Sequence, residues 1–245
     1  MEKKLTIPYL YLIAIILLIP WLITPILILH NPETIFGIIY NLISITLIPI
    51  GTYLTVHYFN HSSNQKRYII EMGIIAVLTE IPVNILLTHS VLPTIHSPIF
   101  AIVLVLVIKY TVEQATRDMN KMSKFNFITV FALLIATALS LALNIYQATL
   151  ICLYAIAFIA TESHKKYTPY AAIAMITVFC LILFFQSQVI NYSYFASLLG
   201  LLPICLCDDT PQYLPGEEKH PKIRYLYKSA FVILPIIASI ILIFV

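Results

Sequence analysis

Residues 66–88 read KRYIIEMGIIAVLTEIPVNILLT, two basic residues followed by a long and mostly apolar run. An α-helix rises about 1.5 Å per residue, so some 20 apolar residues cross the roughly 30 Å of hydrocarbon in a membrane. The run from Tyr68 to Thr88 has that length. This stretch therefore predicts a membrane-spanning helix that begins at a basic loop.

The composition of the whole chain agrees with this prediction. The 245 residues are 60% hydrophobic and only 10% charged, and the mean hydropathy is +0.94. Such values exclude an ordinary water-soluble domain, and with only 5 glycines there is no Gly-rich phosphate loop. We therefore expect residues 1–245 to form one all-α integral membrane domain, a single bundle of about nine transmembrane helices. The predicted spans are residues 5–29, 35–56, 68–88, 93–110, 127–145, 147–161, 169–186, 189–206 and 223–244.

Basic residues follow a strict alternation along these spans. Loops that contain Lys or Arg alternate with loops that contain neither, so every basic residue falls on one side of the predicted bundle. Cytoplasmic loops carry the excess of Lys and Arg in membrane proteins. The alternation predicts a cytoplasmic amino terminus and an external carboxyl terminus. The span at 147–161 is short, and the sequence leaves open whether it crosses fully.

Glu80 is the most unusual residue of the predicted third span. An ionisable group inside a membrane costs roughly 2.5–3.5 kcal/mol on insertion scales, and it is usually paired or functional. Asn84 lies one helical turn further along, and Pro82 between them frees the carbonyl of Leu78. We expect Glu80 to act as a base and Asn84 as a hydrogen-bond donor. The alternative is that both are buried polar groups that hold helices together.

Two histidines flank the external mouth above Glu80, namely His89 and His96. Imidazole moves protons near neutral pH, and we place His89 with Glu80 and Asn84 in the predicted catalytic group. We expect no metal site, because Cys205 and Cys207 lack a second pair of ligands at metal-binding spacing.

Two parts of the chain carry recognisable motifs. The first is Gly51-Thr52-Tyr53-Leu54-Thr55, followed by Lys66-Arg67-Tyr68 and by Leu78-Thr79-Glu80-Ile81-Pro82-Val83-Asn84. The second is the start of the last span, which has Lys222, Arg224, Tyr225 and Tyr227 ahead of Pro235. These motifs resemble those of the TraX family of multi-span membrane proteins. Two other features of that family are not found, an Asp-His pair in the first span and a His after Tyr-Pro in the last.

The resemblance implies an enzyme of the bacterial inner membrane that acetylates the amino terminus of a pilin subunit. Acetyl-coenzyme A would be the donor, and the membrane bilayer and a pilin or another small membrane protein would be the partners. We expect no nucleic acid. Basic residues of the cytoplasmic face would receive the cofactor's phosphates, although attraction to anionic lipid accounts for them equally well. These residues are Lys66, Arg67, Lys109, Lys165 and Lys166.

Three functional classes remain open from the sequence. An acyltransferase requires a cavity that reaches from the basic face towards Glu80. A non-catalytic accessory or chaperone protein for pilin assembly requires only an apolar surface for a partner's helix. A small-molecule transporter requires broken helices paired near the membrane midplane, and only Pro49 and Pro82 hint at these. The sequence names neither the acyl group nor the oligomeric state.

Overall fold

The structure is a computed structural model. It describes residues 5–30, 35–91, 95–116, 122–143, 145, 147–162, 164–187, 192–208 and 223–244. These residues form helices almost throughout, which confirms the predicted all-α class. The α-helices are α1 (Ile7–His30), α2 (Ile35–Asn60), α3 (Gln65–Thr88), α4 (Pro98–Thr116), α5 (Met122–Ala142), α6 (Ala148–Ala160), α7 (Thr168–Ser187), α8 (Tyr192–Ser197), α9 (Leu201–Cys205) and α10 (Ile223–Phe244). Two short 3₁₀ turns are η1 (Lys165–Tyr167) and η2 (Leu198–Gly200), and two two-residue strands, β1 (Leu5–Thr6) and β2 (Cys207–Asp208), pair in parallel.

Each predicted span contains a helix, but the eighth is divided. Residues 192–205 form α8, η2 and α9 in succession instead of one regular helix. In this region Gly200 packs against α2 at Pro49, which lies inside that helix, and a Cβ atom at Gly200 would overlap the Thr46 carbonyl and the Pro49 ring. The close approach requires glycine, and it seats the divided segment against α2.

The fourth helix begins later than the apolar pattern suggests. Residues 95–97 are not helical, and α4 starts at Pro98. Proline suits the first position of a helix, and the residue before a proline avoids helical geometry. The Ser97 hydroxyl accepts a hydrogen bond from the Ile99 backbone N–H at 3.4 Å, as a helix-capping serine does. The connection between α3 and α4 therefore includes an extended stretch beside α3.

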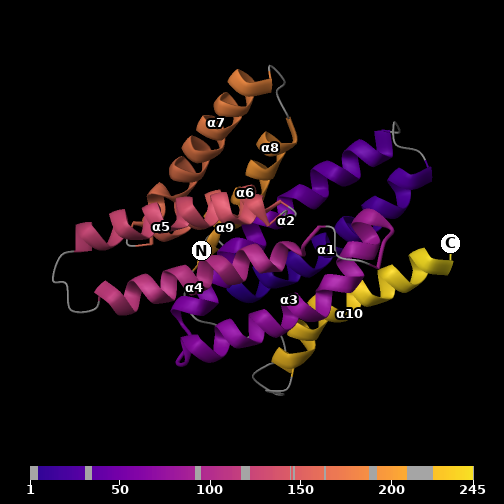
Figure 1. The fold of residues 1–245 in the computed structure, drawn as a ribbon, viewed down its shortest axis with the longest axis horizontal. Coiled ribbons are helices and arrows are strands. Elements are labelled where there is room, and N and C mark those ends of the chain that lie inside the picture. The colour runs from indigo at the N-terminus through magenta and orange to yellow at the C-terminus, as the bar shows by residue number, and fades with distance from the viewer. Residues whose placement is uncertain are drawn as a thin grey trace.

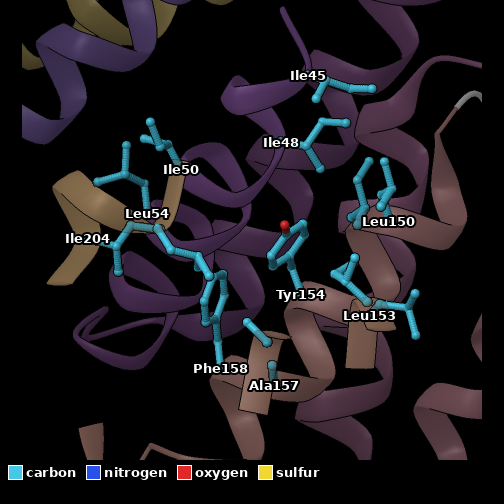
Figure 2. Close-up of a cluster of buried hydrophobic side chains, with 14 of the residues drawn as sticks. Ile45, Ile48, Ile50, Leu54, Leu150, Leu153, Tyr154, Ala157, Phe158 and Ile204 are labelled. Carbon is cyan, nitrogen blue, oxygen red and sulfur yellow. The ribbon is translucent and has the colours of Figure 1, made fainter. Parts of the chain in front are cut away.

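The short helix α6 lies at the centre of the fold. Nearly all of its side chains are buried, and they pack against α2, α4, α5 and α7. In Figure 2, Tyr154 and Phe158 of α6 lie among side chains from α2 and beside Ile204 of α9. In Figure 1, α7 and α10 lie on opposite sides of the molecule, with the other long helices between them. Thirteen residues rise only about 20 Å, so α6 is a buried core helix shorter than the roughly 30 Å of hydrocarbon, and it leads from Ile145 beside His96 to Glu162 beside Lys109.

The helix ends that carry basic residues lie together. Gln65 at the start of α3 hydrogen-bonds to Glu113 near the end of α4, and Lys109 of α4 contacts Glu162, which follows α6. The β1–β2 pair joins the residues before α1 to those after α9. We call this region the basic end. The spatial grouping agrees with the alternation of basic and non-basic loops.

Many large apolar side chains remain exposed on the outer helices. Five of them line α3, namely Ile70, Ile74, Val77, Leu78 and Ile81. Comparable residues cover α5, α7 and α10. Two helical stretches of the described residues, Gln65–Thr88 and Pro98–Ala115, are long and apolar enough to cross a membrane by length and composition, and the other apolar helices of the described residues are shorter.

Candidate functional site

Glu80 lies in the middle of α3, where the stretch before α4 meets it. One carboxylate oxygen lies 2.5 Å from Nδ1 of His96, and the other accepts a hydrogen bond from the Ser97 backbone N–H at 3.0 Å. Both carboxylate oxygens therefore have partners just before the amino-terminal end of α4. A carboxylate is favoured there by the unpaired N–H groups of the helix start. Glu80 thereby fixes the start of α4 against α3.

His96 is positioned from three directions. Glu80 holds Nδ1, the Phe100 ring lies edge-on to the imidazole with centroids 6.0 Å apart, and the His96 backbone forms a bridge to Ile145 between α5 and α6. The His96 side chain is 40% exposed, whereas that of Glu80 is 14% exposed. A carboxylate that binds one ring nitrogen sets the tautomer and leaves the other nitrogen for proton transfer. This arrangement can accept or donate a proton through Nε2.

Asn84 and His89 are placed differently from Glu80. The Asn84 amide donates to the Ser90 carbonyl at 2.8 Å and accepts from the Ile95 backbone N–H at 3.3 Å. Asn84 is fully buried, and it closes the connection between α3 and α4. His89 ends α3 in the left-handed conformation at φ 53°, with its backbone N–H bonded to Ile85. Of the two histidines considered from the sequence, the structure brings His96 to Glu80.

Two neighbouring cavities lie between the helices close to this pair, although neither Glu80 nor His96 lines them. The first, of about 120 Å³, is lined at the basic end by Tyr58, Tyr68 and Glu71. The second, of about 110 Å³, is lined by Thr79 and Ser97, the residues next to Glu80 and His96. The cavities share four lining residues, Gly51, Ile99, Ile102 and Phe231.

The path along these cavities follows α3 from Tyr68 to Val83, a rise of about 22 Å. The walls are mainly apolar and belong to α1, α2, α3, α4 and α10, with α6 at the second cavity. A ligand in the second cavity would contact Thr79 and Ser97, the sequence neighbours of Glu80 and His96.

Lys109 does not offer its charge to a ligand. Its side chain is 1% exposed, and its Nζ lies 2.6 Å from the Glu113 carboxylate and 3.0 Å from the Glu162 carboxylate. A buried ammonium requires such partners, because leaving it unpaired in the interior is costly. The role that the structure supports for Lys109 is to join α4 to the end of α6.

The other predicted cofactor-binding residues lie near the surface of the basic end. Lys66 is exposed, with Nζ 6.0 Å from the centroid of the Tyr110 ring. Arg67 is exposed and forms an i,i+4 pair with Glu71 at 3.1 Å. Lys166 in η1 lies over the Tyr167 ring. The side chain of Lys165 lies outside the described residues. Lys66, Arg67 and Lys166 are thus the candidates for contact with phosphate.

The missed elements of the site are the pairing of His96 with Glu80 and the role of Ser97. A signal for them exists in the sequence: Ser97-Pro98 is a strong helix start, and it places the residues just before it at the amino-terminal end of α4. The predicted catalytic group contained His89, whereas the histidine that contacts Glu80 is His96.

No group of three or more His, Cys, Asp or Glu side chains that would hold a metal occurs within the described ranges. The comparisons with known proteins add no relative. No family model, no curated protein and no solved structure matches this chain. The resemblance to the TraX family therefore stays a prediction.

Proposed function

We propose that the chain is a multi-span protein of the bacterial inner membrane, with the basic end in the cytoplasm, the amino terminus inside and the carboxyl terminus outside. Support comes from the many large apolar side chains that are exposed on α3, α5, α7 and α10. Soluble monomers rarely expose large contiguous apolar patches. The grouping of basic helix ends supports the orientation.

In that membrane the chain acts as a TraX-like acyltransferase. It moves an acetyl or larger acyl group from coenzyme A to the amino terminus of a pilin or another small membrane protein. The observation that carries this proposal is the Glu80–His96 pair close to two neighbouring cavities, the first of which begins at the basic end. Acyl transfer to an amine requires a positioned base and a route for the donor. His96 takes the role of base, and Glu80 orients it.

The transfer step is balanced as follows. A neutral amine attacks the thioester carbonyl carbon, so a nitrogen–carbon bond forms while the carbon–sulfur bond breaks. The proton lost by the nitrogen moves to Nε2 of His96 and then to the departing thiolate, which leaves as the coenzyme A thiol. Glu80 stabilises the imidazolium that exists between these two proton transfers. Lys66, Arg67 and Lys166 contact the cofactor's phosphates at the basic end.

A second candidate function is a non-catalytic accessory role in pilin assembly. The exposed row on α3, formed by Ile70, Ile74, Val77, Leu78 and Ile81, is a face against which a partner's apolar helix would pack. The internal cavities, of about 120 and 110 Å³, are too small to hold a helix. A helix with side chains is about 10–12 Å wide. This role requires neither His96 nor a route for coenzyme A.

The two functions are separated by mass spectrometry of the pilin amino terminus in cells that carry variants of this gene. We expect acetylation or a larger acyl mass with the native chain and with His89→Asn, and its loss with His96→Asn. Both substitutions replace an imidazole by an amide, and asparagine tolerates the left-handed backbone of residue 89. An acylated pilin in the His96→Asn strain would refute the proposed role of His96 as the base. A pilin that is never acylated, although its assembly depends on this gene, would establish the accessory role.

A further inference from the structure

One buried hydroxyl in the cavity path has no hydrogen-bond partner. Thr52 is 3% exposed, its Oγ1 is the buried side-chain polar atom for which the described residues supply no partner, and it lines the second cavity. The other buried threonines contrast with it: Thr79 bonds to the Ile75 carbonyl and Thr161 to the Ala157 carbonyl. A buried hydroxyl without a partner costs about 1–3 kcal/mol. A ligand oxygen in the cavity would satisfy Thr52.

The position of Thr52 indicates which part of a ligand it contacts. Its neighbour Gly51 lines both cavities, so Thr52 lies where they meet. On the basic side of this junction the walls carry Tyr58, Tyr68 and Glu71. Beyond the junction the walls are apolar except for Thr52 itself, Thr79, Ser97 and Gln147. The Thr52 hydroxyl suits a carbonyl oxygen of a ligand, and the apolar walls of the second cavity suit a hydrocarbon tail.

We propose that the acyl donor is a coenzyme A thioester whose carbonyl oxygen accepts a hydrogen bond from Thr52 and whose acyl tail occupies the second cavity. The proposal deepens the transferase function and rests on it for the identity of the donor. An apolar cavity of about 150 Å³ holds a benzene-sized molecule. The second cavity, at about 110 Å³, therefore suits about four or five carbon atoms. Its length agrees, because it follows α3 only from Thr79 to Val83, about 6 Å. The preferred donor is thus longer than acetyl.

The experiment measures the binding of free coenzyme A and of its acetyl, hexanoyl and dodecanoyl thioesters to the full chain in lipid nanodiscs by calorimetry. A buried methylene is worth about 0.8 kcal/mol, so we expect hexanoyl-coenzyme A to bind at least tenfold more tightly than acetyl-coenzyme A. The dodecanoyl thioester should gain little over hexanoyl. Equal affinities for the acetyl and hexanoyl thioesters would overturn the inference.

Two variants locate the carbonyl and the tail. Thr52→Val keeps the shape and removes the hydroxyl, so it should weaken both thioesters about three- to tenfold and leave free coenzyme A unchanged. Gly51→Leu projects into the junction, where nothing lies within 4 Å of a Cβ atom, and it should abolish the preference for hexanoyl. Gly73→Leu is the matched control, because its Cβ position is equally open and Gly73 lines neither cavity. An unchanged preference in Gly51→Leu would place the tail elsewhere and refute the proposal.

The outcome separates this inference from the transferase function. Chain-length preference without transfer to any acceptor would leave the binding site established and the enzymatic function refuted. Transfer that is equally rapid with acetyl and hexanoyl donors would leave the enzyme established and the tail cavity refuted.

Discussion

Among the described residues two acid–base contacts join neighbouring helices, and they differ in what they leave free. At the basic end, the Lys109 ammonium lies between the carboxylates of Glu113 and Glu162 and is almost wholly buried. Beside the second cavity, Glu80 meets His96, whose ring is substantially exposed. In the first contact the ammonium is paired with two carboxylates and has almost no exposure to solvent. The second uses one nitrogen of the imidazole and leaves the other available.

The difference shows why charge at a helix junction does not by itself identify a site. Lys109 was a candidate for phosphate binding because of its residue type and its place in a basic loop. Because Lys109 is buried against two carboxylates, its role is to hold α4 against the end of α6. His96 has a similar anionic partner, but it retains an exposed ring and lies next to the cavity-lining residue Ser97. Exposure and the remaining hydrogen-bonding capacity distinguish the two sites.

The largest expected effect is on the contact of Lys109 with Glu113 and Glu162. The double variant Glu113→Gln and Glu162→Gln leaves the Lys109 ammonium buried without a counter-charge, and we expect it to lose about 3–5 kcal/mol in the free energy of unfolding. Adding Lys109→Met should recover most of that loss, because a neutral cluster no longer has a charge to bury. Denaturant unfolding of the detergent-solubilised protein, followed by circular dichroism, measures both. If the triple variant is as unstable as the double, the lysine is not the source of the cost.

Substitutions in the Glu80–His96 contact should change the enzymatic activity more than the stability of the protein. Glu80→Gln keeps the shape but removes the charge that orients and stabilises His96, and we expect the acyl-transfer rate to fall about 10²-fold or more. Because the two residues act as a unit, Glu80→Gln combined with His96→Asn should be no slower than either alone. The measurement is transfer of radiolabelled acyl groups in proteoliposomes. Rate losses that multiply in the double variant would show that the residues act separately.

The connection that carries His96 offers a third test of the comparison. Asn84→Ala removes the bonds to the Ser90 carbonyl and the Ile95 N–H, and leaving these groups unpaired should cost about 1–3 kcal/mol in unfolding free energy. We also expect slower transfer, since this connection positions the imidazole. Thr137→Val is the control, because the Thr137 hydroxyl bonds only within its own helix, to the Leu133 carbonyl, among the described residues. A stable but inactive Asn84→Ala variant would instead support a direct catalytic role for Asn84.

The smallest effect is expected at the exposed ion pair. Arg67→Gln breaks the contact with Glu71, in which the Arg67 side chain is 71% exposed, and we expect less than about 0.5 kcal/mol in unfolding free energy. Its effect on ligand binding should be larger: together with Lys66→Gln it should weaken coenzyme A binding and flatten the salt dependence of that binding. Lys3→Gln with Lys4→Gln controls for general attraction to lipid. Equal weakening by both pairs would indicate membrane charge in place of a cofactor site.

The sequence by itself determined the helical class. This class follows from local physics, because apolar runs such as residues 68–88 form helices of fixed rise. The sorting of the loops by basic charge stays a prediction. The sequence also identified Glu80, because an ionisable residue in such a run requires a partner. The break between α8 and α9 was not visible, because it depends on the contact of Gly200 with α2.

Only the tertiary structure decided which groups meet. His96 reaches Glu80 because the chain doubles back along α3 before α4 begins at Pro98, a path that residue spacing does not reveal. Lys109 is buried because α6 brings Glu162 to α4 across 53 positions of sequence. The cavity path and the unpartnered hydroxyl of Thr52 arise from the packing of several helices. Periodicity and charge act over one helical turn or one loop, whereas partner choice depends on how whole helices pack.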